Sequence, residues 1–161
     1  MKEQIYLDYA ATTPVDEDVF EAARPYYTEI FYNPSSSHFL GQKAFAAVEK
    51  AREKCALAIN CHPDEIYFTS GGAESINWAL GGVGGGIAVS AIEHDSALEK
   101  AKMLSKSGTE VTYVMPDKDG IITPEALHSA ATDKTRLVCV MTVNNIVGSI
   151  QPIKELARVA H

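Results

Sequence analysis

The most informative feature of the chain is the stretch Phe68-Thr69-Ser70-Gly71-Gly72-Ala73-Glu74-Ser75. It follows the β-rich run 65–68 and precedes the helix-compatible run 75–80. A strand that ends in paired glycines and leads into a helix lets the backbone approach an anion without a clash at Cβ. The free N–H groups and the positive dipole end of the helix then face the negative charge. The stretch therefore predicts a phosphate site. The alternative is a plain structural turn, because many loops of this kind carry paired glycines.

Elements of alternating type follow this stretch. We expect strands at residues 65–69, 87–90, 111–115 and 137–143, and helices at 74–80 and 95–105, from 123 and from 152. Thr123 is the predicted cap of its helix, with Pro124 at the first helical position. This order predicts an α/β fold, a mainly parallel sheet with helices on both faces.

The first part of the chain is predicted to be helical. Residues 1–15 are expected to form an arm, with a short strand or extended segment at 5–7, and residues 16–161 to form the α/β domain. A helix at 16–31 has Asp16 as its cap and Pro25 as a bend or break. A polar loop at 32–38 precedes a helix at 40–59, whose apolar face is formed by Phe45, Val48, Ala51, Cys55 and Ile59.

Composition excludes several classes of function. The chain has 161 residues, the size of one ordinary domain, and a net charge of -7 without a basic block, which argues against nucleic-acid binding. No run approaches the length of a membrane span, and no apolar region follows the charged start, so we expect neither a membrane protein nor a signal peptide. Three cysteines without a CxxC pair indicate a reduced, cytoplasmic protein, and no metal site is expected.

Ligands of parallel sheets bind outside the carboxyl ends of the strands, so the polar residues at these ends matter most. His94 follows the strand at 87–90. It either stacks on an aromatic cofactor or moves a proton, or it is an ordinary polar residue at a helix start. Asn144 and Asn145 follow the last predicted strand. They either bind a ligand hydroxyl or form a turn, for which asparagine is well suited.

Five motifs together resemble those of cysteine desulfurases in the class V aminotransferase family. They are residues 7–14 (Leu-Asp-Tyr-Ala-Ala-Thr-Thr-Pro), 33–38 (Asn-Pro-Ser-Ser-Ser-His), the stretch 68–75, Glu93-His94, and Val143-Asn144-Asn145. They occur in the order of the family and are spread over the whole chain, which makes the match specific.

The resemblance implies a pyridoxal-phosphate enzyme with the large domain of fold-type I. Such an enzyme takes sulfur from L-cysteine, leaves alanine and is usually a homodimer. It implies a sulfur acceptor protein and a role in iron–sulfur cluster assembly. The substrate entrance would lie near Asn33 and His38.

The resemblance also assigns roles at the cofactor. Gly72 and Ala73 would face its phosphate, His94 would stack over its pyridine ring and take part in proton transfer, and Asn145 would hydrogen-bond the ring hydroxyl. Two positions depart from the family. Ala73 stands where threonine is usual, which removes one hydroxyl from the phosphate cradle, and Ile146 stands where glutamate is usual, for which we have no physical account.

The family's cofactor-bound lysine, the carboxylate that pairs with the pyridinium nitrogen and the sulfur-accepting cysteine would lie beyond the matched segment. The lysines here occupy ordinary solvated positions, and Cys55 and Cys139 are interpreted as core residues, whereas Cys61 lies near a turn. Residues 16–161 are therefore expected to be an incomplete large domain.

Three functions remain open from the sequence. The chain is either the N-terminal part of a desulfurase, which is inactive without a C-terminal half or oligomer, or a non-catalytic relative that binds a partner. The third alternative is part of a related selenocysteine or cysteine lyase. A reading frame continuing past codon 161 would indicate a fragment.

Overall fold

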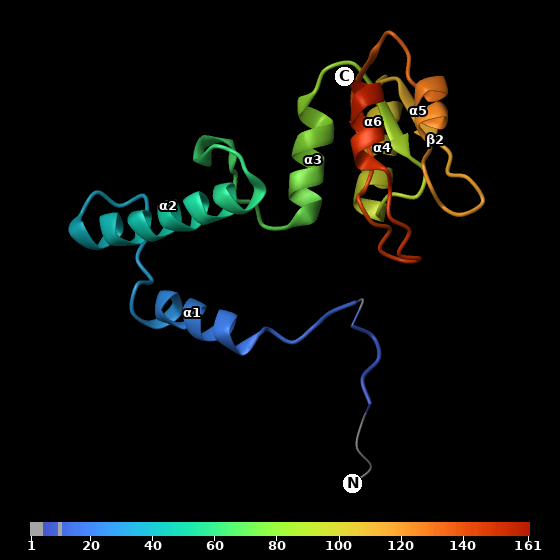
Figure 1. The fold of residues 1–161 in the computed structure, drawn as a ribbon. Coiled ribbons are helices and arrows are strands. Elements are labelled where there is room, and N and C mark those ends of the chain that lie inside the picture. Colours follow the sequence, from blue (N-terminus) through green and yellow to red (C-terminus); the bar gives the residue numbers. More distant parts are fainter. Residues whose placement is uncertain (1–4, 10) are drawn as a thin grey trace. The chain divides into compact units, whose positions relative to one another are not determined.

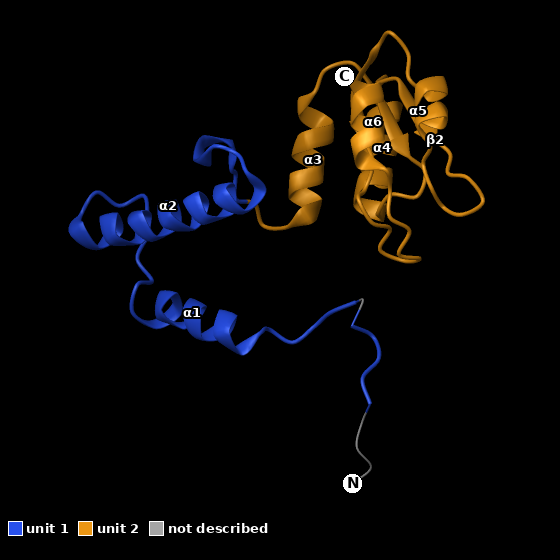
Figure 2. Cartoon of the chain, viewed as in Figure 1, with its two compact units in different colours: residues 1–68 blue, residues 69–161 orange. Residues whose placement is uncertain are grey.

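A computed structural model of the chain describes residues 5–9 and 11–161. Two compact units are present, unit 1 at residues 1–68 and unit 2 at residues 69–161 (Figure 2). Residues 5–7 form no strand. Part of the predicted arm lies outside the described residues, and the predicted division into an arm and one domain stays a prediction.

Unit 2 is a three-layer α/β structure (Figure 1). Its elements are α3 (Gly72–Gly82), β1 (Gly86–Ser90), α4 (Asp95–Lys106), β2 (Val111–Val114), α5 (Pro124–Ala130), β3 (Thr135–Cys139) and α6 (Ile153–Ala160). The strand order is β2-β1-β3, and both pairs with the central β1 are parallel. The predicted α/β fold class is confirmed.

The central strand contributes to two hydrophobic clusters because alternate side chains of a strand point to opposite faces. Ile87 and Val89 pack with Leu80 of α3 and with alanines of α4. Ala88 packs with a second set, made up of Val114 of β2, Ile122 of the segment before α5, Leu127 of α5 and Leu156 of α6. Helices α3 and α4 thus cover one face and α5 and α6 the other. Burial on both faces explains why β1 is an apolar run without alternation.

The predicted strand at residues 65–69 is wrong. A short 3-10 helix, η1 (Pro63–Glu65), occupies its start, and the residues after it pair with no strand in the described part of the chain. The Arg52 guanidinium, on a helix of unit 1, donates a hydrogen bond to the Ile66 carbonyl and lies 5.0 Å from the ring centroid of Phe68. This side chain anchors the segment, so its β-rich composition does not lead to strand pairing.

The last strand was predicted at residues 137–143. In the structure this strand, β3, spans Thr135–Cys139, so it begins earlier and is shorter than predicted. The chain then turns back on itself. Val143 and Ile150 form an antiparallel bridge, and the Asn144 N–H donates to the Ser149 carbonyl at 2.9 Å. These antiparallel bonds replace a continued parallel pairing with β1, which ends at Ser90.

Unit 1 contains α1 (Glu17–Thr28) and α2 (Phe39–Ile59). Asp16 caps α1 as predicted, since its Oδ1 accepts the Asp18 N–H at 3.0 Å. Pro25 lies inside α1 without dividing it. The helix ends at Thr28, before the predicted end at residue 31.

The predicted apolar face of α2 is largely exposed. Phe45 is 53% exposed and Ile59 is 68% exposed. Cys55 is also exposed, so its interpretation as a core residue is wrong. The buried positions of this helix are Gly41, Ala44 and Ala56, which helical periodicity places on the same side as the predicted apolar residues. Helical spacing therefore predicted the element and this side of it, but not how far the larger apolar side chains are exposed.

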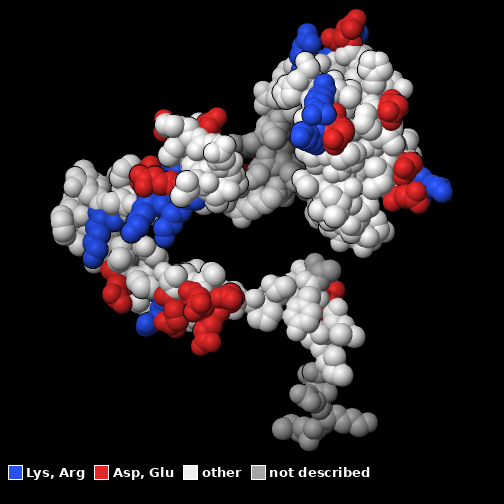
Figure 3. Space-filling model, viewed as in Figure 1, with Lys and Arg blue, Asp and Glu red and all other residues white. Residues whose placement is uncertain are grey.

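Charge is unevenly distributed over unit 1. Figure 3 shows acidic side chains gathered over α1, which carries Glu17, Asp18 and Glu21, and basic side chains along α2. Within residues 5–9 and 11–161, no helix is both long enough and apolar enough to cross a bilayer.

Candidate active site

The topology of unit 2 brings three predicted segments to one edge of the sheet. Helix α4 begins just after the carboxyl end of β1, and α3 ends just before the amino end of β1. The two helices pack together on the same face, so both begin at the carboxyl edge. The loop after β3 starts at this edge too. Gly72 and Ala73, His94, and Asn145 therefore belong to the same edge of one unit.

The start of α3 presents backbone donors. Gly71 is its N-cap and has no side chain to bond them. The Ser75 N–H donates to the Gly71 carbonyl at 3.2 Å, whereas within the described chain the N–H groups of Gly72 and Ala73 have no acceptor. A Cβ built on Gly71 or Gly72 would meet nothing within 4 Å. The space over the turn is open, so packing does not require these glycines.

Side chains hold the turn in shape from within. The carboxylate Oε2 of Glu74 accepts hydrogen bonds from the N–H and the Oγ–H of Ser70, each at 2.7 Å. These bonds from Ser70 lower the pKa of Glu74 below its usual value. Thr69 Oγ1 lies 2.7 Å from Ser75 Oγ and donates to the Gly71 carbonyl at 3.1 Å. The turn is therefore preorganised before any ligand arrives.

His94 is the N-cap of α4 and is exposed. Its Nδ1 accepts the Ser96 N–H at 3.1 Å and lies 2.8 Å from Ser96 Oγ. Because Nδ1 accepts a hydrogen bond from a backbone N–H, the neutral imidazole carries its proton on Nε2. No described residue bonds Nε2, which leaves it available as a donor.

The paired asparagines have different surroundings. Asn144 is 7% exposed, and its Oδ1 accepts the N–H groups of Ile146 and Val147, both at 2.9 Å. Its Nδ2 donates to the Ile92 carbonyl at 2.9 Å. Asn145 is exposed, and its amide has no hydrogen-bond partner among the described residues. Asn144 thus supports the loop, while the Asn145 amide is left for a ligand.

Glu93, the neighbour of His94, is half-buried and reaches the segment after β3. Its Oε1 accepts the Met141 N–H at 2.6 Å, and its Oε2 lies 3.9 Å from Cys139 Sγ. Burial raises the pKa of Glu93. Burial, with the neighbouring Glu93 charge, raises the pKa of Cys139 to about 11. Cys139 is therefore a thiol at neutral pH and a poor nucleophile.

The roles of Glu93 and Asn144 were not predicted from the sequence. The partners of Glu93 lie 46 and 48 residues away along the chain. Spacing along the sequence carried no signal of these contacts. The paired asparagines were a signal, but the pair alone does not tell which member is buried.

Asn33 and His38 belong to unit 1 and have local roles there. Asn33 Oδ1 accepts the Ser35 N–H at 2.9 Å, and His38 Nδ1 caps α2 by accepting the Gly41 N–H at 3.2 Å. Gly41 packs so closely on Ser36 that a Cβ at this position would clash. The predicted place of Asn33 and His38 near a substrate entrance stays a prediction.

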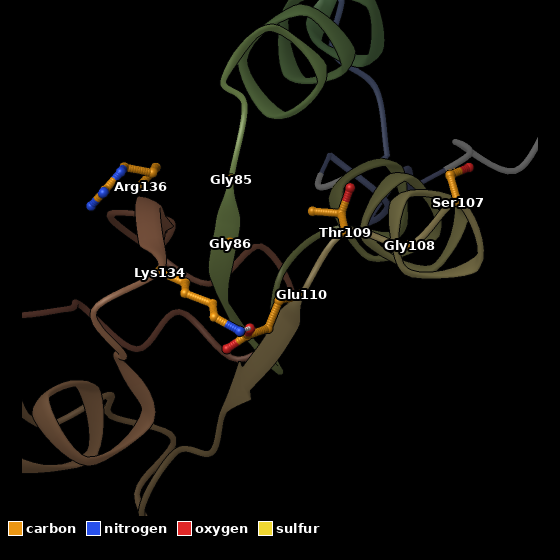
Figure 4. Close-up of a pocket in the computed structure, with 8 residues that line it drawn as sticks. All are labelled: Gly85, Gly86, Ser107, Gly108, Thr109, Glu110, Lys134 and Arg136. Atoms are coloured by element: carbon orange, nitrogen blue, oxygen red, sulfur yellow. Dashed lines mark ion pairs between the residues drawn. The ribbon is translucent and has the colours of Figure 1, made fainter.

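A hollow of unit 2 lies at the opposite, amino edge of the sheet (Figure 4). It measures about 560 Å³ and is lined by loop and strand-start residues, including Gly86, Thr109 and Arg136. An ion pair between Lys134 Nζ and Glu110 Oε2, 3.5 Å apart, lies in it. None of the predicted site residues lines this hollow. Among the described residues, no group of three or more His, Cys, Asp or Glu side chains forms a metal site.

Relatives of known identity resemble the chain over nearly its whole length. The cysteine desulfurase IscS of Dictyoglomus turgidum is 46% identical over 99% of this chain and 42% of its own length. That of Methanosarcina thermophila is 45% identical over 97% of this chain and 40% of its own length. The chain thus spans about two fifths of these relatives.

Solved structures also resemble the chain over nearly its whole length. A NifS-like protein superposes with a TM-score of 0.91 and is 38% identical, over 98% of this chain and 45% of its own. SspA, solved in complex with cysteine, superposes with a TM-score of 0.92 and is 37% identical, over 96% of this chain and 47% of its own. The family model for aminotransferase class V matches residues 5–161. The resemblance inferred from the five motifs is confirmed, and the chain belongs to the class V aminotransferase family.

Proposed function

We propose that this chain supplies the cofactor-holding part of a pyridoxal-phosphate-dependent cysteine desulfurase, which converts L-cysteine to alanine and enzyme-bound sulfur. One observation carries the proposal. Backbone donors of Gly72 and Ala73, the Nε2 of His94 and the amide of Asn145, all without partners in the described chain, belong to the same edge of one parallel sheet. The names of the relatives support this reading.

The donors suit the parts of pyridoxal phosphate. A phosphate fits the amino end of α3, where free N–H groups and the positive helix end stabilise an anion. An amide such as that of Asn145 suits a ring hydroxyl or its anion, because it donates and accepts. The flat imidazole of His94 suits stacking on an aromatic ring.

When bound, the cofactor supplies an electron-withdrawing ring that weakens bonds at the substrate's Cα and Cβ. His94 would move a proton near the ring. If Nδ1 is also protonated, it can no longer accept the hydrogen bond from the Ser96 N–H. It would instead donate a hydrogen bond to Ser96 Oγ, 2.8 Å away. The Ser96 hydroxyl therefore allows His94 to be held in both protonation states.

The chain is proposed to be inactive by itself, because none of its lysines lies in a motif of the family's cofactor lysine. Its sulfur would pass to an acceptor protein and serve iron–sulfur cluster assembly in a reducing, cytoplasmic compartment. A selenocysteine or cysteine lyase would use the same cofactor residues.

A non-catalytic partner-binding role is the second candidate. The free edge of β3 favours it, since Leu137, Val138 and Cys139 are only half-buried there.

A chimera tests the proposal, in which this chain replaces the matching residues of the Dictyoglomus turgidum desulfurase. We expect the chimera to bind pyridoxal phosphate and to release alanine from L-cysteine, and the chain alone to release none. Alanine is measured by chromatography. A folded chimera that binds the cofactor but produces no alanine would favour the non-catalytic role.

We also expect that the chain alone is not a stable monomer. Beside β3 lie two apolar hollows, of about 230 Å³ toward α3 and about 210 Å³ toward α6. An uncovered strand edge with apolar flanks favours pairing with another polypeptide. The partner would be a second copy or the part of a desulfurase that this chain lacks.

Sedimentation velocity at micromolar concentration checks this expectation. Self-association, or a single complex with the remaining part of the relative's chain, is the expected result. One monomeric species that unfolds cooperatively would show that the sheet is complete as it stands.

A further inference from the structure

Two loops at the carboxyl edge of unit 2 are joined by side chains that lie next to the proposed cofactor residues. The first loop, residues 91–94, ends at His94, and the second, residues 140–148, contains Asn145. Glu93 of the first loop accepts the Met141 N–H of the second at 2.6 Å. Asn144 of the second loop donates to the Ile92 carbonyl of the first at 2.9 Å. Each loop thus holds the other through the residue just before its cofactor residue.

Each joining residue is also fixed within its own surroundings. Asn144 is buried, and its Oδ1 accepts hydrogen bonds from the N–H groups of Ile146 and Val147, which follow Asn145 in the chain. The Glu93 N–H donates to the carbonyl of Ser90 at 3.4 Å, and Ser90 is fully buried in the central strand. The two bonds therefore connect the rigid end of β1 with the loop after β3.

We propose that Glu93 and Asn144 are positioning residues of this desulfurase, which act through His94 and Asn145 by holding the two loops in one register. The proposal rests on the proposed function. Neither residue contacts the cofactor in this account. The two bonds fix the direction in which the neighbouring imidazole and amide leave the backbone, and a misplacement of about 1 Å at reacting groups costs on the order of a hundredfold in rate.

Hydrogen exchange of the chain alone tests the clamp without cofactor. Glu93→Ala should speed exchange of the Met141 amide at least about tenfold, because its acceptor is lost. It should also speed exchange of the Ile146 and Val147 amides, whose own acceptor, Asn144, is unchanged. Glu93→Gln keeps a carbonyl oxygen for the Met141 N–H and should restore protection of all three amides.

Glu99→Ala is the matched control, because Glu99 is an exposed carboxylate of α4 that pairs with Lys102 at 2.6 Å. It should leave the three amides as they are in the unsubstituted chain. Exchange at Ile146 and Val147 unaffected by Glu93→Ala would show that the loops are not coupled and would overturn the clamp. If Glu93→Ala does not fold, failure of Glu93→Gln to protect the Met141 amide overturns it equally.

Turnover of the chimera separates positioning from a general structural role. Glu93→Ala should lower turnover about ten- to a hundredfold when His94 is present, and by a clearly smaller factor in the His94→Ala background, where only its effect through Asn145 remains. A merely structural residue would lower turnover equally in both backgrounds, and that result would overturn the proposal. An unsubstituted chimera without turnover would instead count against the proposed function, and hydrogen exchange would still decide the clamp.

Discussion

Turnover of the chimera is expected to fall at least about tenfold when His94 is replaced by alanine, at the low end of what a general acid–base group contributes. The imidazole is exposed at the carboxyl edge, with Nδ1 held by Ser96 and Nε2 available as a donor. Alanine has no group to move a proton near neutral pH. Steady-state alanine release measures the effect.

The control for this substitution must preserve the helix cap. His94→Ala removes the cap of α4, which costs about 1 kcal/mol of stability without any catalytic reason. His94→Asn keeps a capping oxygen but no imidazole, so it should lose turnover as His94→Ala does, with less loss of stability. Full turnover in a folded His94→Asn chimera would make His94 a capping residue only.

Affinity for pyridoxal phosphate is expected to rise about ten- to a hundredfold when Ala73 is replaced by threonine. A hydroxyl at the amino end of α3 adds a hydrogen bond to a charged phosphate, on the order of 1.5–3 kcal/mol. The lower helix propensity of threonine removes only a few tenths of a kcal/mol. Equilibrium dialysis of the chimera gives both dissociation constants.

Ala73→Val is the matched control, because valine has the shape of threonine without its hydroxyl. It should bind the cofactor no more tightly than the unsubstituted chimera. Equal affinity of the threonine and valine variants would mean that this turn does not hold the phosphate.

Local signals in the sequence predicted much of unit 2. The paired glycines at 71 and 72 correctly marked the start of a helix. Thr123 and Pro124 marked the start of α5, where Thr123 Oγ1 accepts the Ala126 N–H at 3.1 Å. Such signals act between residues a few positions apart, so they can be read from one sequence.

Contacts between distant residues could not be predicted in this way. The run at 65–69 has strand composition, but Arg52 bonds it instead of a neighbouring strand. The buried member of the asparagine pair is set by Ile92, 52 residues away. The alternation of strands and helices, in contrast, correctly placed the predicted site residues of unit 2 at one edge of the sheet. Their roles toward the cofactor stay predictions.

Binding of pyridoxal phosphate by Gly72→Pro and Gly72→Ala chimeras tests whether the amino end of α3 holds the cofactor phosphate. Proline is tolerated at the first position of a helix but has no N–H, whereas alanine keeps the donor. Gly72 is the first residue of α3, so only one cradle donor changes between the two variants. We expect the proline variant to bind pyridoxal phosphate about tenfold or more weakly than the alanine variant, and both variants to bind phosphate-free pyridoxal equally. Equal affinity of the two variants for pyridoxal phosphate would mean that the Gly72 N–H does not bind the phosphate.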